Sequence, residues 1–519
     1  MELSTIINAP LILALIISLL ILASTLTHKK STTSLLFKNN RRRRRPPGPW
    51  RLPLVGSLHH MLTSQPQAAL RDLAGKHGPV MYLRLGQVDA VVVSSPAAAQ
   101  AVLREHDLSF ASRPSLLGTE IAFYGNRDLA FAPYGAYWRA VRKLCTVELL
   151  SPRKVRHFAP ARHGETMALV AELRAAAAAG EPVNVGALIV SCANSIAGLA
   201  TFGGRCGGER KEQFLAAMAV VMANISGFCV SDLFPSLGFV DVVTGTRRRI
   251  RRAHRELEDV LDKIVAECEA RRRERKARQG GGEEDDLVSV MLRIKDEEGE
   301  ESEFNIKAII VDMFTAGTET TSSTAEWVMS ELMRNPSVMA KAQAEVRRVF
   351  NNKRPCDHET HMDELCYIRM VIKETLRLHP PIPLLLPHLC RETCDISGFK
   401  VEKGSRVIVN AWAIARSPEY WDDAEKFIPE RFENSTVDYK GSQFHYLPFG
   451  SGRRMCPAMG FGLATLELII ARLLYYFDWS LPDGMQREDL DMGMTVGVTA
   501  RKTNQLHLVA LPYDVPMEI

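Results

Sequence analysis

A long stretch from Asn305 to Arg334 contains no proline, and the first proline after it is Pro336. Proline in a helix interior removes a hydrogen bond and clashes with the preceding turn, so this stretch predicts one long helix. Other stretches also favour helices: Ser95–His106, much of 135–271 with one helix ending at Gly180, Asp363–Leu378, and Pro457–Phe477. We therefore expect a mainly α fold.

The expected β portion is small. Val80 to Ser95 is rich in β-branched residues and interrupted at Gly86, which predicts a hairpin. Short strands are expected on both sides of a turn at Lys403 and Gly404, and a last hairpin within 499–510. The charged, glycine-rich segment Arg271–Asp286 is expected to be an exposed loop.

The N-terminal region predicts a membrane anchor. Ile6 to Leu26 carries no charge and is long enough to cross a bilayer. Lysines and a run of arginines follow it, which favours a retained span with the body in the cytosol over a cleaved signal peptide. We divide the chain into an anchor (1–28), a basic stretch and proline-rich hinge (29–56), and one large body (57–519).

Charge and cysteine content exclude two classes of protein. The net positive charge is concentrated in the N-terminal 45 residues, so the body is nearly neutral and is not expected to bind nucleic acid. The ten cysteines are scattered without a Cys-x-x-Cys pair. This pattern indicates reduced thiols in a cytosol-facing protein rather than a disulfide framework.

One cysteine, Cys456, lies in an unusual loop that reads PFGSGRRMCPAMG. A thiolate is a strong ligand for soft metals and haem iron, and nearby cations and a helix N-terminus lower the pKa of a thiol. The loop supplies both, and its relevant residues are Gly450, Gly452, Arg453, Arg454 and Pro457. The alternative for a lone cysteine is a buried structural thiol.

The long predicted helix contains an acid and an alcohol in sequence, Glu319 and Thr320. A carboxyl and a hydroxyl can relay protons, and the small Ala316 and Gly317 leave room for a bound diatomic. The alternative for Thr320 is a mid-helix hydroxyl that bonds a carbonyl one turn back.

Two further patterns place charged residues on helices. Glu374 and Arg377 share a helix face, an arrangement that in isolation is a weak surface ion pair. Trp138 and Arg142 are four residues apart; the guanidinium can bind a carboxylate bidentately and the indole can donate one hydrogen bond.

Taken together, these residues resemble the haem-thiolate cytochrome P450 monooxygenases. Phe449, Gly452, Arg454 and Cys456 match the family's Phe-x-x-Gly-x-Arg-x-Cys-x-Gly loop, and Ala458 departs from its last glycine. The other motifs follow the family's order, and with the anchor and hinge the likeness covers nearly the whole chain. The chain is similar to plant microsomal members, in particular a grass branch that oxidises labdane-related diterpenes.

The resemblance implies a single triangular, mainly α unit with a small β portion, holding haem b. Cys456 would ligate the iron, and Thr320 and Glu319 would be catalytic. The implied haem contacts are Phe449, Arg454, Trp138, Arg142 and His388. His388 departs from the arginine that relatives often have there. The resemblance also implies a buried triad of Glu374, Arg377 and Arg431 behind the haem.

The implied activity inserts one atom of O2 into a small hydrophobic molecule. Electrons would come from an NADPH–cytochrome P450 reductase at the endoplasmic reticulum membrane, docked through cations such as Arg139, Lys143 and Arg453. The expected substrate contacts come from four segments: Ser112–Asp128, Ile309–Thr318, Ile382–Leu386 and Val496–Val498. A terpenoid is expected, with an aromatic or alkaloid substrate as the rival. A reductase-independent isomerase or dehydratase and a non-catalytic haem protein are the alternative classes.

Overall fold

The computed structural model describes residues 45–204, 209–277, 286–298 and 304–514. The anchor expected at 1–28 and most of the basic stretch lie outside these residues. The helices are α2 (Pro66–His77), α3 (Pro96–Gln100), α4 (Leu117–Ala122), α5 (Ala136–Leu144), α6 (Pro152–His157), α7 (Ala159–Ala179), α8 (Val185–Phe202), α9 (Glu209–Asn224), α10 (Val230–Leu233), α11 (Val240–Val243), α12 (Thr246–Ala277), α13 (Leu287–Glu298), α14 (Ile306–Arg334), α15 (Pro336–Phe350), α16 (Cys366–Leu378), α17 (Ala411–Ile414) and α18 (Met459–Tyr476).

The strands form small separate sheets. They are β1 (Val80–Leu85), β2 (Val88–Val93), β3 (Val183–Asn184), β4 (His388–Leu389), β5 (Cys394–Ile396), β6 (Phe399–Val401), β7 (Arg406–Val409), β8 (Phe477–Ser480), β9 (Met494–Val496), β10 (Ala500–Lys502) and β11 (His507–Pro512). The largest sheet has the order β1-β2-β7-β4, and the others are β3-β11-β8, β5-β6 and β9-β10. The expected mainly α fold with a small β portion is confirmed.

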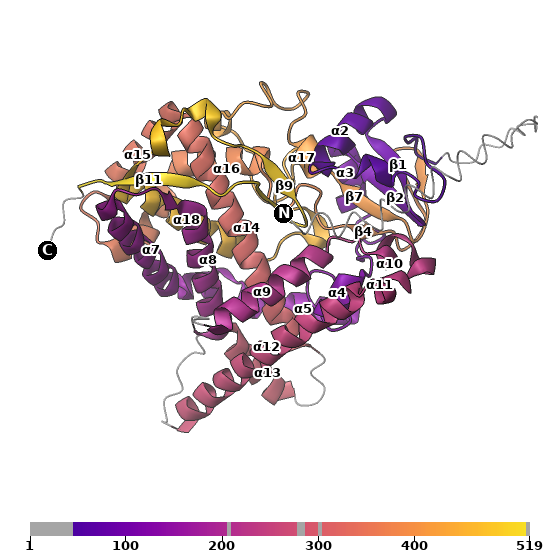
Figure 1. The fold of residues 1–519 in the computed structure, drawn as a ribbon, viewed down its shortest axis with the longest axis horizontal. Helices are drawn as coiled ribbons and strands as arrows, with labels where there is room; N and C mark the ends of the chain where they lie inside the picture. The colour runs from indigo at the N-terminus through magenta and orange to yellow at the C-terminus, as the bar shows by residue number, and fades with distance from the viewer. Residues whose placement is uncertain (1–44, 205–208, 278–285, 299–303, 515–519) are drawn as a thin grey trace, which may run out of the picture.

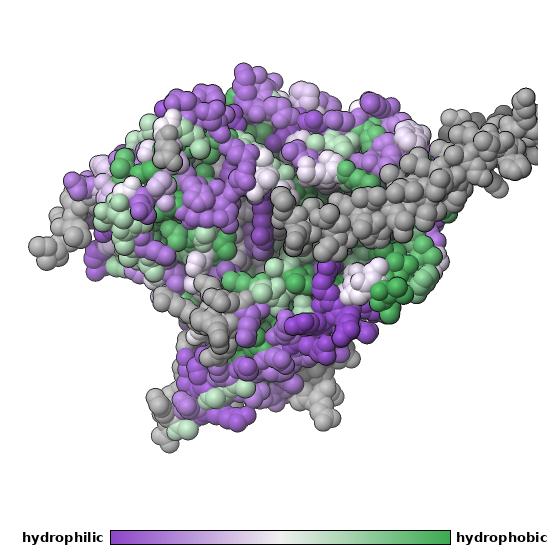
Figure 2. Space-filling view, in the orientation of Figure 1, coloured by the Kyte–Doolittle hydropathy of each residue, from purple (hydrophilic) through white to green (hydrophobic). Residues whose placement is uncertain are grey.

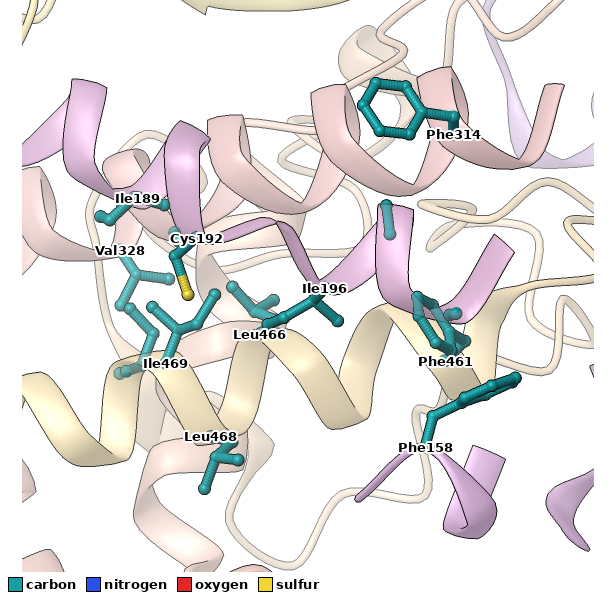
Figure 3. Packing of buried hydrophobic residues seen from close by; sticks show 14 of the residues in the cluster. Phe158, Ile189, Cys192, Ile196, Phe314, Val328, Phe461, Leu466, Leu468 and Ile469 are labelled. Atoms are coloured by element: carbon teal, nitrogen blue, oxygen red, sulfur yellow. The ribbon is translucent and has the colours of Figure 1, made fainter. Parts of the chain in front are cut away.

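The long helix α14 runs through the middle of the molecule (Figure 1). It packs against α8 and α18, and residues on all of its sides are buried. In Figure 3, Val328 of α14, Cys192 of α8 and Ile469 of α18 point toward one another in the core. The helix begins after Asn305, whose side chain accepts from the Ala308 N–H, and ends at Asn335 before Pro336. The predicted long helix is confirmed.

Two helices, α8 and α18, are long and apolar enough to cross a membrane among the described residues. About two thirds of each lies buried inside the body, 67% for α8 and 61% for α18. Their apolar composition is therefore explained by their packing against α14.

Several predicted boundaries differ from the structure. Residues 271–277 continue α12, so this part of the expected loop is wrong, while residues 278–285 are not described. The last hairpin is also wrong, because β10 pairs with β9 whereas β11 pairs with β8 and β3. The helix predicted from Asp363 begins at Cys366, after a 3-10 segment.

The proline segment Pro46–Gly56 packs on the body. The Tyr82 N–H donates to the Pro47 carbonyl at 2.7 Å. A Cβ at Gly48 would lie 2.0 Å from the Tyr82 carbonyl oxygen, so only glycine allows this approach. Val55 is buried in the apolar cluster beside the sheet. The described end of the hinge is thus held against β1.

The triad that the resemblance implied, Glu374, Arg377 and Arg431, is formed. Glu374 binds Arg377 at 2.7 Å and Arg431 at 3.0 Å, and the Glu374 and Arg377 side chains are fully buried. The Arg377 guanidinium also donates to the carbonyls of Ala415 and Ala424. These bonds join α16 to the segment that precedes the cysteine loop.

Candidate functional site

In the cysteine loop, Cys456 lies between a 3-10 turn at Gly452–Arg454 and the start of α18. The Cys456 N–H donates to the Phe449 carbonyl at 3.0 Å, which closes the loop on itself. Gly452 has a φ of +70°, and a Cβ there would lie 2.2 Å from the Leu103 carbonyl oxygen. Glycine is therefore required where the loop meets the segment after α3.

The protonation of Cys456 is set differently from the sequence-based expectation. Burial raises the pKa of its thiol, while the Ala458 N–H and the Arg142 charge oppose that rise. Arg453 instead pairs with Asp107 at 2.7 Å. The prediction that Arg453 and Arg454 lower this pKa is wrong, because both side chains point to other partners and Arg142 supplies the cation.

Arg454 is the centre of a buried basic cluster. It donates to the carbonyls of Ala111 at 2.6 Å, Leu129 at 3.3 Å and Ala132 at 2.5 Å. Its guanidinium carbon lies 4.2 Å from the centre of the Trp138 ring, a cation–π contact. Burial lowers the pKa of Arg454 to about 10.

Arg113 belongs to the same cluster and was missed from the sequence. It is buried and donates to the carbonyls of Leu386 at 2.7 Å and Pro387 at 3.0 Å. Burial, together with the nearby Arg454 charge, lowers the pKa of Arg113 to about 9. The available signal was its position in a segment already expected to contact substrate.

His388, on β4, completes this cluster. It is buried, and its Nδ1 lies 2.7 Å from the Phe110 carbonyl oxygen. Burial and the charge of Arg113 hold the pKa of His388 well below its ordinary value. A neutral imidazole is therefore the form that occupies this position.

Trp138 and Arg142 project from α5 toward the same region. The Trp138 Nε1–H donates to the Leu129 carbonyl at 3.1 Å, and Arg142 Nη2 donates to the Met455 carbonyl at 2.8 Å. Arg142 thus reaches the residue next to Cys456. Phe449, at the start of the loop, has its ring centre 5.6 Å from the ring centre of Tyr439.

These residues fit a haem. Among the residues that the structure describes, no ion pair joins Arg113, Arg142 or Arg454 to a carboxylate; they bond mainly to backbone carbonyls. Guanidinium groups whose pKa is lowered mainly by burial favour a bound anion, and haem carries two carboxylates. With one thiol held at a helix start nearby, the donor set matches that group.

Asp312 of α14 fixes the backbone that this cluster uses. Its carboxyl accepts from the N–H groups of Leu129 at 2.7 Å and Ala130 at 3.1 Å. Burial, and then the neighbouring Asp128, raise the pKa of Asp312 well above its ordinary value. Since the Leu129 carbonyl accepts from both Trp138 and Arg454, Asp312 indirectly positions both.

The acid and the alcohol of α14 have different partners. The Thr320 hydroxyl donates to the Ala316 carbonyl at 2.7 Å, which is the arrangement of an ordinary mid-helix threonine. The Glu319 carboxylate forms an ion pair with Arg501 of β10. Arg501 was missed because its strand is far away in sequence.

Hydrogen bonds link the expected substrate segments, or residues next to them. Arg113 joins the first segment to Leu386, and Asp312 joins α14 to Leu129, just after the first segment. The Ala500 N–H donates to the Pro381 carbonyl at 2.8 Å, and the Ser323 hydroxyl donates to the Ala500 carbonyl at 2.7 Å. The β9–β10 hairpin is therefore tied to α14 and to the segment after α16.

Comparisons with known proteins identify relatives of this chain. The protein-family model described as Cytochrome P450 matches residues 46–508. The chain is 62% identical over 471 residues to 9-beta-pimara-7,15-diene oxidase of Oryza sativa subsp. japonica, covering 90% of this chain and 92% of that protein. It is 60% identical over 484 residues to Cytochrome P450 99A2 of the same plant, covering 91% and 89%. It is 48% identical over 476 residues to premnaspirodiene oxygenase of Hyoscyamus muticus, covering 91% and 94%.

Proposed function

The chain belongs to the cytochrome P450 family and is a haem-thiolate monooxygenase, and from this premise we propose that it oxidises a terpenoid olefin, specifically a labdane-related diterpene. The observation that carries the proposal is the 62% identity, over nearly the whole chain, to a relative named as a pimaradiene oxidase. A second relative, 48% identical, is also named for a diene.

The residues of the four substrate segments are consistent with such a substrate. Ile382, Leu384, Leu385 and Leu386 are all apolar, as are Val496 and Val498. Ile309 and Ile310 of α14 are buried in the core. A largely apolar lining suits a hydrocarbon with few polar groups.

We assign the haem, as haem b, to the basic cluster and the cysteine loop. Cys456 is the proposed iron ligand. The two carboxylates of the haem are proposed to bind Arg113, Arg142, Arg454, Trp138 and His388. The bound haem supplies activation of O2, which its thiolate ligand favours. The protein holds the group and excludes water from it.

We assign the delivery of protons for the reaction to residues of α14. The Glu319 carboxylate is mostly buried, and its partner Arg501 is 53% exposed, so this ion pair connects the helix to solvent. Thr320 is the next residue, and its hydroxyl donates to the Ala316 carbonyl. We assign proton uptake to the Glu319 carboxylate and proton donation to the Thr320 hydroxyl.

The family requires an electron-donating partner, and we propose that this partner is the NADPH–cytochrome P450 reductase of the endoplasmic reticulum. The uncharged N-terminal run, outside the described residues, supports a single-span anchor with the body in the cytosol. An exposed apolar surface supports membrane contact (Figure 2). Its most exposed members are Phe239 at 62% and Val243 at 80%.

The turn between β1 and β2 joins α10 to the proline segment. The Gln87 N–H donates to the Leu233 carbonyl, and the Gly86 N–H donates to the Val55 carbonyl. The exposed Leu54 therefore lies on the same side of the molecule as α10 and α11. A membrane that holds the anchor would meet these residues together.

Product analysis tests the substrate. Membranes containing the full chain and its reductase are supplied with labdane-related diterpene olefins and, separately, with aromatic substrates. We expect products one oxygen atom heavier only from the olefins, and only with NADPH. Oxidation of the aromatic set alone would reject the diterpene proposal and favour the rival, which a relative named desmethyl-deoxy-podophyllotoxin synthase, 46% identical, represents.

Spectroscopy tests the ligand independently of any substrate. We expect the reduced, CO-bound protein to show the Soret band of thiolate ligation, and Cys456→Ala to lose it. Cys366→Ala is the control, because Cys366 is exposed at the start of α16. A thiolate band that persists in Cys456→Ala would reject the assignment.

A further inference from the structure

Two cysteines that the haem site does not use lie on either side of a short loop. Cys390 directly follows β4 and is 1% exposed, and Cys394 is the first residue of β5 and is partly exposed. Three residues, Arg391 to Thr393, separate them. Sequence reasoning counted both among scattered thiols, because their spacing matches no common motif.

The backbone holds both cysteines against one segment. The Cys390 N–H donates to the Ser405 carbonyl at 2.9 Å, and the Gly404 N–H donates to the Cys390 carbonyl at 2.8 Å. Cys394 pairs with Val401 in the β5–β6 ladder. Cys390 and Cys394 are therefore anchored to positions a few residues apart on the same chain segment.

Both cysteines lie beside the same residue, Val401. Cys390 Sγ is 3.8 Å from the carbonyl oxygen of Val401, the residue that pairs with Cys394. Both residues pack against the same apolar cluster, and each thiol is the main influence on the pKa of the other.

The arrangement makes the two thiols unequal. The neighbouring Cys390 lowers the pKa of the Cys394 thiol, whereas Cys394 and burial raise the pKa of the Cys390 thiol. Thiolates are the attacking species in thiol–disulfide exchange, and access to the sulfur is also needed. Cys394 meets both requirements, whereas Cys390 can react only with a partner that is already beside it.

We propose that Cys390 and Cys394 form a reversible thiol–disulfide modification site that takes a small disulfide oxidant, glutathione disulfide. The Cys394 thiolate attacks one sulfur of the oxidant, its S–S bond breaks, and one glutathione leaves as a thiolate. Cys390 then loses its proton to that thiolate and attacks the Cys394 sulfur, which releases the second glutathione. Two protein thiols become one disulfide, and one glutathione disulfide becomes two glutathione thiols.

The pair of Cys390 and Cys394 adjoins the basic cluster through β4. The strand carries His388, and the Leu389 N–H donates to the Ser112 carbonyl at 2.8 Å. The Arg391 N–H donates to the Ser109 carbonyl at 2.8 Å. A disulfide would replace the bond from Cys390 Sγ to the Glu392 carbonyl, now 3.0 Å, and stiffen the connection between β4 and β5.

Peptide mapping of the full-length holoprotein tests the proposal. The protein is equilibrated in glutathione buffers of increasing disulfide content, free thiols are alkylated, and the chain is cleaved with trypsin. Trypsin cuts after Arg391, between the two cysteines. We expect the two resulting peptides to remain joined until a reductant is added, and alkylation of Cys390 and Cys394 to fall by the same fraction.

Two variants give opposite results if the order of attack is right. Cys390→Ser is expected to stop at a mixed disulfide between Cys394 and glutathione. Cys394→Ser is expected to leave Cys390 unmodified, because the buried thiol cannot reach the oxidant. The exposed Cys356 serves as the control, and Cys356→Ser should leave oxidation of the pair unchanged.

Two outcomes would overturn the proposal. In the first, both thiols of the wild-type protein stay fully alkylated in a buffer that already glutathionylates Cys356. In the second, each cysteine carries its own glutathione and no joined peptides form. Both are read from the wild-type protein alone, so a variant that fails to fold does not prevent a decision.

Discussion

The backbone of Leu129 is the most heavily used acceptor in the basic cluster. Its N–H is bound by Asp312, and its carbonyl accepts from Trp138 and Arg454. A single residue of α14 therefore controls the geometry of two side chains on other elements. The local sequence around Asp312 does not predict this role.

Removing the Asp312 carboxyl tests that role. Asp312→Ala leaves the N–H groups of Leu129 and Ala130 without their acceptor, and a buried unsatisfied donor costs ~1–3 kcal/mol. We expect the free energy of unfolding, measured in urea, to fall by about 2–5 kcal/mol. Asp312→Asn keeps an acceptor oxygen and should lose much less; an equal loss in both variants would contradict this explanation.

Arg501 is the second residue whose role depends on the tertiary structure. Its ion pair with Glu319 fixes the carboxylate to which we assign proton uptake. Arg501→Gln is expected to lower the product formed per NADPH consumed, with substrate affinity, measured from the absorbance shift, unchanged. Arg501→Lys keeps the charge and should keep the ratio. An unaltered ratio in Arg501→Gln would remove Arg501 from proton delivery.

At the scale of elements, α16 is fixed by the buried triad. Arg377→Met leaves Glu374 buried with only Arg431, and breaking a buried ion pair of this kind costs ~3–5 kcal/mol. Guanidinium denaturation should show a loss of that size. Arg354→Met is the matched control, because Arg354 and Asp357 have the same spacing on the surface. Similar losses in both variants would argue against burial as the cause.

The contact between α16 and α18 predicts a pH dependence. Burial raises the pKa of Glu467 to about 7, opposed by Arg369 and reinforced by Asp363. Tyr439 also faces this carboxyl. An unfolded glutamate titrates near pH ~4.3, so between these values the folded protein binds more protons, and its stability falls as the pH rises.

Glu467→Gln removes this titration. The variant and the wild type should be nearly equally stable near pH ~4, where Glu467 is protonated in both states. The variant should then become relatively more stable up to about pH 7, by at most about 4 kcal/mol. Urea unfolding at several pH values measures the difference, and a difference independent of pH would refute the assignment.

For the molecule as a whole, α5 has one side at the haem site and another in solvent. Arg142 reaches the Met455 carbonyl, whereas Arg139 and Lys143 are exposed. Because opposite charges steer association, reversing both exposed residues to glutamate should slow reduction by the reductase and weaken its salt dependence. Arg354→Glu serves as the control, and unchanged reduction kinetics in the double variant would exclude this docking surface.

The sequence predicted the helices best where the pattern was long. It predicted α14 closely and the Ser95 start of α3, because proline placement and capping are local properties. It failed for 271–277, where helix α12 continues through charged residues, and for the last hairpin. Strand pairing is decided by contacts distant in sequence, and β11 finds its partners at β8 and β3.

The sequence by itself determined the chemistry of this protein. A cysteine, a tryptophan–arginine pair, an acid and an alcohol at the required spacings indicated a haem-thiolate monooxygenase, since each local motif limits which reactions are possible. The tertiary structure decided which groups act on one another. Arg142 rather than Arg453 or Arg454 faces Cys456, Arg501 reaches Glu319, and Arg113 joins Arg454. These contacts depend on how distant elements pack, and no local pattern encodes them.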